Sequence, residues 1–135
     1  MQVANKLDET MQSVPQIMAV IRQGINYSLF LVVMSRGPFG LKDWSKFLHL
    51  SERTLQRIKK DNKRFDPIYT EKILEIAQVQ KKGIEVFENV DTFNQWMTTR
   101  TIALGGITPK SLLDNTFGIH MLLEELTRIE HGILS

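Results

Sequence analysis

Residues 41–60 read LKDWSKFLHLSERTLQRIKK and carry the clearest structural signal in the chain. Its first eight residues place Leu41, Trp44 and Leu48 three and four positions apart, which is the spacing of one face of a helix. After a short turn, Ser51 is a good N-cap for a second, strongly basic helix. Two short helices joined by a three-residue turn predict a helix-turn-helix.

The helix expected over residues 52–60 has two different sides. Leu55 and Ile58 point inward, and most of the other side chains are long and polar. In a helix-turn-helix the second helix lies in the major groove, and the residues near its start reach the base edges. We expect base contacts from Arg53, Thr54, Gln56 and Arg57, and phosphate contacts from Ser51, Lys59, Lys60, Lys63 and Arg64. The pattern alone also allows an ordinary amphipathic hairpin with a basic surface.

Charge is distributed unevenly along the chain, although its formal net charge is only +2. Residues 36–64 contain nine basic and three acidic side chains, whereas residues 65–135 contain six basic and ten acidic ones. Residues 1–35 carry two charges of each sign. A cationic middle followed by an anionic C-terminal half indicates two surfaces with different partners.

The composition excludes several classes of protein. The chain has 135 residues, of which 42% are hydrophobic, and this suits one domain or two small domains that share a core. It has no cysteine, which excludes disulfide frameworks, thiolate catalysis and cysteine zinc sites. The longest apolar run, Leu29–Met34, is too short to span a membrane, and the polar N-terminus is not a secretory signal. We therefore expect a soluble, cytoplasmic protein with no membrane partner.

Capping signals predict two helices before the decisive stretch. Ser13 followed by Val14-Pro15 opens a helix that Gly24 closes, and Asn26 caps a second helix over residues 27–34. The core of the second helix is also compatible with a buried strand, but no partner strand is visible. The apolar stripe of the first helix consists of Ile17, Val20 and Ile21.

Further helices are expected after the basic one. Pro67 begins a helix that continues to Phe87, Asp91 caps the next, and Thr108 opens a short one before the last helix over residues 116–130. The expected core residues of these helices are Ile68, Ile73, Leu74 and Ala77, then Phe93, Trp96 and Met97, then Leu112 and Leu113, and finally Met121, Leu122, Leu126 and Ile129. The predicted fold is all-α and compact.

Catalytic and metal-binding patterns are weak. His120 and Glu124 are four residues apart on one expected helix, and His49 and His131 are the other histidines. Such scattered groups are more typical of solvated side chains than of a metal site. No Ser-His-Asp pattern or phosphate-binding glycine loop has usable spacing. We therefore expect a non-enzymatic protein without cofactor, metal or catalytic residues, with a metal-dependent enzyme as the remote alternative.

The C-terminal half contains a more distinctive motif. Trp96 is followed by Leu104-Gly105-Gly106-Ile107-Thr108-Pro109, then by Leu112-Leu113, and at the end by Arg128-Ile129-Glu130-His131-Gly132. The paired glycines permit a turn with positive φ, and Gly132 is placed to end the last helix in a left-handed conformation. Residues 133–135 would then form a short tail.

This motif, together with residues 51–57, resembles the Xre/ParS-type antitoxins of bacterial toxin–antitoxin pairs, whose usual partner is a RES-domain toxin. The resemblance covers roughly residues 41–135. Two positions depart from it, because such proteins often have a polar residue at Ile107 and a basic one at Ile58.

The resemblance implies an antitoxin that neutralises an NAD-consuming RES toxin through its C-terminal helix and tail. It also implies a homodimer that represses its own operon by binding operator DNA. We accordingly expect an Xre-like DNA-binding domain over residues 1–88 and a toxin-binding and dimerisation domain over residues 89–135. The implied toxin-facing residues are Arg128, Glu130, His131, Gly132, Ile133, Leu134 and Ser135. The alternative is a stand-alone helix-turn-helix transcription regulator whose C-terminal domain only dimerises.

Overall fold

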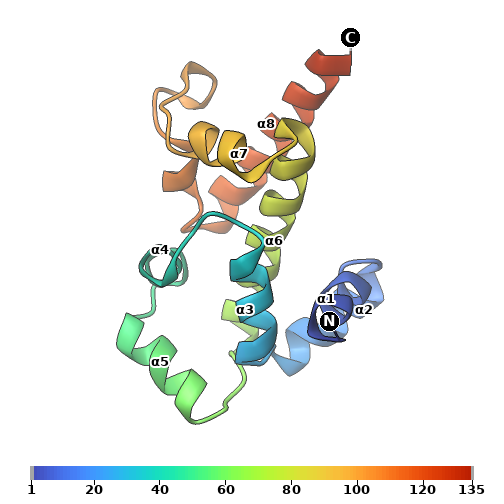
Figure 1. Cartoon of the computed structure of the whole chain (residues 1–135), viewed down its shortest axis with the longest axis vertical. Helices are drawn as coiled ribbons and strands as arrows, with labels where there is room; N and C mark the ends of the chain where they lie inside the picture. Colours follow the sequence, from blue (N-terminus) through green and yellow to red (C-terminus); the bar gives the residue numbers. More distant parts are fainter. Residues whose placement is uncertain (1, 135) are drawn as a thin grey trace. The chain divides into compact units, whose positions relative to one another are not determined.

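A computed structural model describes residues 2–134, and the side chains of residues 4–132. The regular elements of this part of the chain are all helices, connected by turns and loops, with one isolated β-bridge between Thr101 and Ile107 (Figure 1), which confirms the all-α prediction. The chain divides into two compact units, Met1–Leu74 and Glu75–Ser135, and the division falls inside helix α6 (Pro67–Phe87). The boundary expected after residue 88 lies one residue beyond the end of this helix.

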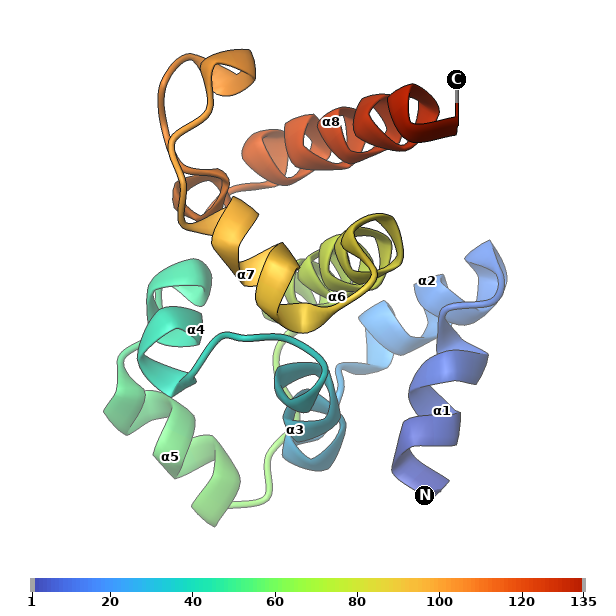
Figure 2. The same ribbon diagram turned by 45° about the horizontal axis from the view of Figure 1, so that its top comes forward.

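The N-terminal unit contains five complete helices and the start of α6. These are α1 (Gln2–Thr10), α2 (Val14–Gln23), α3 (Tyr27–Ser35), α4 (Leu41–Leu48) and α5 (Glu52–Lys60). Figures 1 and 2 both place α3 between α5 and the α1–α2 hairpin. The helices α4 and α5 begin and end at the predicted residues, and Leu29–Val33 is helical rather than extended.

Aromatic side chains fill the core of this unit. The ring of Phe30 lies 5.4 Å from Tyr27, 5.3 Å from Trp44 and 5.1 Å from Phe65, measured between centroids. Phe30 and Trp44 are completely buried. Such aromatic contacts add to the stability that area burial provides, so α3 and α4 are held together at this cluster.

Helix α1 is attached to the end of α3 by a polar contact as well as by packing. Leu7 of α1 is buried, and the Arg36 guanidinium donates a 2.7 Å hydrogen bond to the Asp8 carboxylate. Exposed ion pairs of this kind contribute little to stability, so the buried leucine does most to hold α1 in place.

Hydrogen bonds tie the α2–α3 turn to the segment after α5. The Phe65 amide donates to the Ile25 carbonyl at 2.8 Å, and the Arg64 guanidinium donates to the Gly24 carbonyl at 2.9 Å. The buried Thr70 hydroxyl accepts from the Ile25 amide and donates to the Phe65 carbonyl. Three of these bonds join residues 24–25 to residues 64–70, and the fourth braces Thr70 against Phe65; we call the four together the clasp. The clasp holds the chain just beyond α5. It therefore fixes the position of the C-terminal end of α5.

The C-terminal unit contains the rest of α6, then α7 (Val90–Met97), the 3₁₀ turns η1 (Ile102–Leu104) and η2 (Pro109–Leu112), and α8 (Thr116–Leu134). Its fully buried side chains include most of the predicted ones, namely Phe93, Met97, Leu113, Leu122 and Leu126. Trp96, Leu112, Met121 and Ile129 are only half-buried.

The predictions for Ile68 and Asp91 are wrong. Ile68 was expected in the core but is 70% exposed, because it lies nine residues before the buried Ala77, or about two and a half helical turns away. The cap of α7 is Asn89 rather than Asp91, since the Asn89 side chain accepts the Thr92 amide at 2.7 Å.

Candidate functional site

The turn between α4 and α5 has the geometry of a helix-turn-helix. His49 adopts the left-handed conformation (φ 56°), and the Leu50 amide donates back to the Ser45 carbonyl at 3.1 Å, which ends α4. Two residues later the Ser51 hydroxyl accepts the Thr54 amide at 3.0 Å, which begins α5. This confirms Ser51 as the N-cap, and it also shows that the Ser51 and Thr54 hydroxyls bond to each other.

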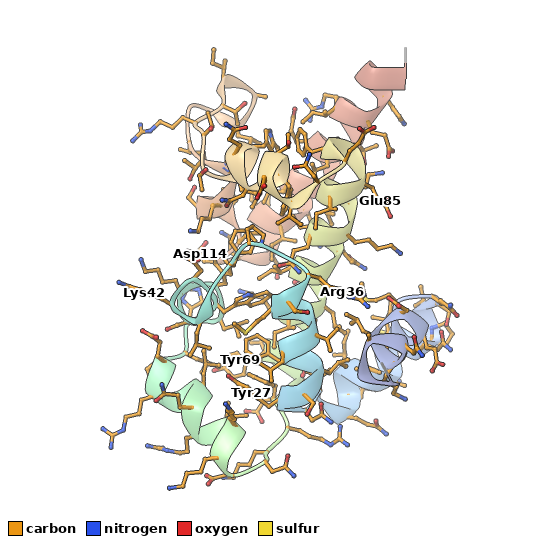
Figure 3. The ribbon with its side chains drawn as sticks, in the orientation of Figure 1. Tyr27, Arg36, Lys42, Tyr69, Glu85 and Asp114 are labelled. Atoms are coloured by element: carbon orange, nitrogen blue, oxygen red, sulfur yellow. The ribbon has the colours of Figure 1, made fainter. Side chains whose placement is uncertain are left out.

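The inner face of α5 is anchored to the core. Leu55 is completely buried and Ile58 is half-buried, and they lie on the face of α5 that was predicted to point inward. The opposite face is in solvent, where basic side chains extend away from the unit (Figure 3). Leu55 therefore anchors α5 to the core, and the basic face of the helix remains accessible to a binding partner.

Four of the predicted DNA-contacting residues lie on one exposed face. Arg53, Gln56, Arg57 and Lys60 are three and four positions apart, and all four line one open surface concavity that also includes Asp61. This spacing places two guanidinium groups and an amide along the outer face of α5, from Arg53 in its first turn to Arg57 in its last turn. These groups are the donors and acceptors that read guanine and adenine edges in the major groove.

The remaining predicted residues have different surroundings. Lys59 lies 6.0 Å above the ring of Tyr27, and burial raises the pKa of the Tyr27 phenol. Lys63 is exposed, whereas Arg64 donates to the Gly24 carbonyl within the clasp. Arg64 thus has a structural contact that its sequence position did not indicate.

Sequence reasoning left two cations out of the candidate set. Lys42 and Lys46 of α4 are exposed and one helical turn apart, in the same basic segment as α5. Since the first helix of this motif crosses the DNA backbone, both are placed for phosphate contacts. The charge count over residues 36–64 included them and is the signal that would have identified them.

The end of α8 differs from the prediction. Gly132 does not end the helix, because α8 continues to Leu134 and Gly132 has no positive φ. Residues 133 and 134 are therefore a continuation of the helix rather than a tail. Their side chains, and Ser135 altogether, lie outside the described residues.

Two predicted partner-facing charges make contacts within the unit. The Lys82 ammonium lies 2.6 Å from the Glu130 carboxylate, and both side chains are about two-thirds buried. The Arg128 guanidinium lies 3.3 Å from the buried Glu125 carboxylate, one turn earlier on α8. His131 and Gly132 are exposed. Glu130 therefore helps to position α8 on α6.

Replacing Gly132 by alanine tests whether α8 continues beyond residue 132. Nothing lies within 4 Å of the place that a Cβ atom would occupy, so alanine meets no obstacle. We expect a small gain in helix content and up to about 1 kcal/mol of stability, measured by circular dichroism during thermal unfolding. A loss of stability would instead indicate a left-handed cap at this glycine.

The glycine motif between α7 and α8 forms a tight turn. Gly105 and Gly106 both have φ of 84°, and the Thr101 amide donates to the Ile107 carbonyl at 3.1 Å. The predicted positive-φ turn is confirmed. Gly118 of α8 lies against η2, because a Cβ atom there would approach the Leu112 carbonyl oxygen to 2.4 Å.

Comparison with known proteins gives matches for both units. Residues 16–78 match the family described as the antitoxin Xre-like helix-turn-helix domain, and residues 82–132 match the antitoxin Xre/MbcA/ParS C-terminal toxin-binding domain. The chain belongs to the Xre-type antitoxins. It is 26% identical over 122 residues to antitoxin Xre of Photorhabdus laumondii, covering 90% of this chain and 82% of that protein. It is 29% identical over 87 residues to antitoxin Xre of Yersinia enterocolitica, covering 64% of this chain and 59% of that protein.

Family membership assigns a role to each part of this antitoxin. The segment with α4 and α5 belongs to its DNA-binding domain, and the segment with α7 and α8 belongs to its toxin-binding domain. Membership also confirms the prediction of a regulator that is not an enzyme. Helix α1 precedes both matched ranges.

The described residues contain neither a metal-binding cluster nor a membrane-spanning helix. Within the part of the chain that the structure covers, no group of three histidine, aspartate or glutamate side chains is placed to hold a metal ion. Over the same residues, every helix is too short or too polar to cross a membrane.

Proposed function

We propose that this antitoxin neutralises a RES-type, NAD-consuming toxin through the end of α8 and represses its own operon by binding operator DNA through α5. The observation that carries the proposal is the outer face of α5, where Arg53, Gln56 and Arg57 stand in solvent on a helix anchored by the buried Leu55. The resemblance of the closing motif to RES-associated antitoxins supports the choice of toxin.

On the DNA side, the proposal gives different roles to the basic residues. Arg53, Gln56 and Arg57 read base edges, and Thr54 lies beside them at the start of the helix. Phosphate contacts come from Ser51, Lys59, Lys60, Lys63 and Arg64, joined by Lys42 and Lys46 of α4. Because the phosphate contacts release counterions, affinity falls steeply as the salt concentration rises.

On the toxin side, the exposed end of α8 is the contact surface. His131 and Gly132 are exposed on its last described turns, and Ile133, Leu134 and Ser135 follow in the chain. Glu130 and Arg128 are each paired within their own unit. They contribute to toxin binding indirectly, because they set the direction of α8. A helix that continues to Leu134 reaches its partner with little ordering cost, because its backbone is already arranged.

Deleting residues 133–135 tests the toxin contact. We expect the shortened antitoxin to lose neutralisation while it keeps its fold and its DNA binding. The measurement is growth and cellular NAD in bacteria that co-express the cognate toxin. The matched control keeps the chain length and replaces Ile133 and Leu134 by alanine, which separates side-chain contacts from helix length.

The outcomes of this deletion are distinct. Full protection by the shortened antitoxin would remove the end of α8 from the toxin interface. A toxin that arrests growth without lowering NAD would contradict the RES assignment while leaving the role of α8 intact. If no toxin co-purifies with the antitoxin, the stand-alone regulator becomes the better description.

A further inference from the structure

One acidic side chain lies among the cations of the proposed DNA-binding surface. The concavity that holds Arg53, Gln56, Arg57 and Lys60 is also lined by Asp61. Asp61 is exposed, and within the described part of the chain its carboxylate has no hydrogen bond or ion pair. A carboxylate on a surface that faces phosphate groups weakens binding, because like charges repel each other.

The local fold does not require this carboxylate. Helix α5 ends through backbone contacts, because the Lys63 amide donates to the Ile58 carbonyl at 3.1 Å and Asn62 is left-handed with φ 51°. Asp61 takes part in this helix end through its own amide, which donates to the Arg57 carbonyl at 2.8 Å. An acidic side chain at the C-terminal end of a helix also opposes the helix dipole. The effect of the Asp61 carboxylate therefore concerns binding rather than stability.

Asp61 lies one helical turn beyond Arg57 and lines the same concavity. Side chains four positions apart on a helix have Cβ atoms about 5–6 Å from each other, so the carboxylate can reach the Arg57 guanidinium. A bidentate contact with guanine uses only some of the N–H donors of an arginine and leaves others for a carboxylate. A guanidinium held by both groups has one orientation, whereas an unrestrained one can turn toward a phosphate.

We propose that Asp61 is a positioning residue that raises the sequence specificity of α5. It orients the Arg57 guanidinium toward guanine, and it repels the phosphates of every duplex. On a matching duplex the orientation of Arg57 offsets the repulsion, whereas on an unrelated duplex only the repulsion remains. The inference rests on the proposed DNA binding through α5.

The test compares the full-length wild type with Asp61→Asn, which removes the charge and keeps the size of the side chain. Asp61→Glu keeps the charge. Asp66→Asn is the matched control, because it removes the same charge from an exposed aspartate that does not line the concavity. Thermal unfolding of each variant checks that the fold is intact.

Three duplexes are needed, and their affinities are measured by fluorescence anisotropy at several salt concentrations. The first is selected from a random library with the wild type. The second carries another base pair in place of the guanine whose preference is lost in Arg57→Ala. The third has an unrelated sequence. The ratio of the first two affinities measures discrimination at the Arg57 position, and the third measures non-specific binding.

We expect Asp61→Asn to bind the unrelated duplex about three- to tenfold more tightly, with a log–log salt dependence that is steeper by about one unit. Its discrimination at the Arg57 position falls about fivefold or more. Asp61→Glu keeps both properties close to the wild type, and Asp66→Asn changes each by less than about twofold. Asp61→Asn unfolds at the wild-type temperature or above it, since the change removes an unfavourable interaction with the helix dipole.

Other outcomes overturn the proposal in distinguishable ways. Unchanged affinity of Asp61→Asn for the unrelated duplex would show that the carboxylate does not face phosphates. An equal gain on all three duplexes would show that Asp61 repels DNA without positioning Arg57. Equal effects of Asp66→Asn would assign the change to net charge alone. If the wild type selects no duplex, the DNA-binding proposal itself fails and this inference fails with it.

Discussion

Replacing both Arg53 and Arg57 by alanine is expected to abolish sequence preference and to weaken binding to the preferred duplex by about 30-fold or more. A bidentate arginine–guanine contact contributes about 1–3 kcal/mol of discrimination, and both side chains lie in solvent on the outer face of α5. Because neither is part of the core, the fold is expected to remain intact. Gel shifts at one fixed salt concentration measure the change.

A matched variant removes the same charge elsewhere. Lys81→Ala with Arg100→Ala takes two exposed cations from the C-terminal unit and is expected to change DNA affinity little. Replacing Lys59 and Lys60 should instead weaken binding to all sequences and reduce its salt dependence. Retained preference in the Arg53/Arg57 variant would place the base-reading surface outside α5.

Gly24→Ala is expected to destabilise the N-terminal unit by about 3 kcal/mol. Gly24 has φ 83° and ψ 142°, a region that is costly for any residue with a side chain. A Cβ atom there would also lie 2.1 Å from the carbonyl oxygen of Phe65, which is a backbone atom of the clasp. Alanine can be accommodated only if residues 24 and 65 separate.

Thermal and denaturant unfolding measure this effect, and Gly40→Ala is the control. Gly40 has φ −89°, and nothing lies within 4 Å of its absent Cβ atom, so this change is expected to cost less than about 1 kcal/mol. Because the clasp fixes the chain beyond α5, Gly24→Ala is also expected to lower DNA affinity at temperatures where the protein stays folded. Equal stability of the two variants would show that the close approach at Gly24 is not required.

Local signals carried most of the fold prediction, because a helix cap involves residues only three positions apart. Ser13, Asn26, Ser51 and Thr108 all accept the amide that their sequence position predicts. Where two polar residues compete for one helix start, as Asn89 and Asp91 do, spacing does not decide between them. The end of α8 was mispredicted for a similar reason, since glycine is tolerated inside a helix as well as beyond it.

The candidate sites likewise contain some residues whose roles could be predicted from the sequence and others whose roles could not. The basic face of α5 follows from a three-to-four periodicity that the sequence displays openly, and its exposure agrees with the structure. The role of Arg64 depends on Gly24, which is 40 residues away, and the role of Glu130 depends on Lys82, which is 48 residues away. Such pairings leave no periodic signal in the sequence. Any hydrogen-bond acceptor along the chain could have been the partner of Arg64, and any cation the partner of Glu130.

The all-α class, the helix-turn-helix with its cationic outer face and the motif that marks the family could all be predicted from the sequence. These depend on propensity, capping and periodicity, which act between neighbours along the chain. The exposure of Ile68, and the contacts by which Arg64 and Glu130 hold helices in place, depend on the tertiary structure alone. Burial and long-range hydrogen bonds depend on which surfaces meet when the chain folds. That packing is determined jointly by residues that are far apart in the sequence.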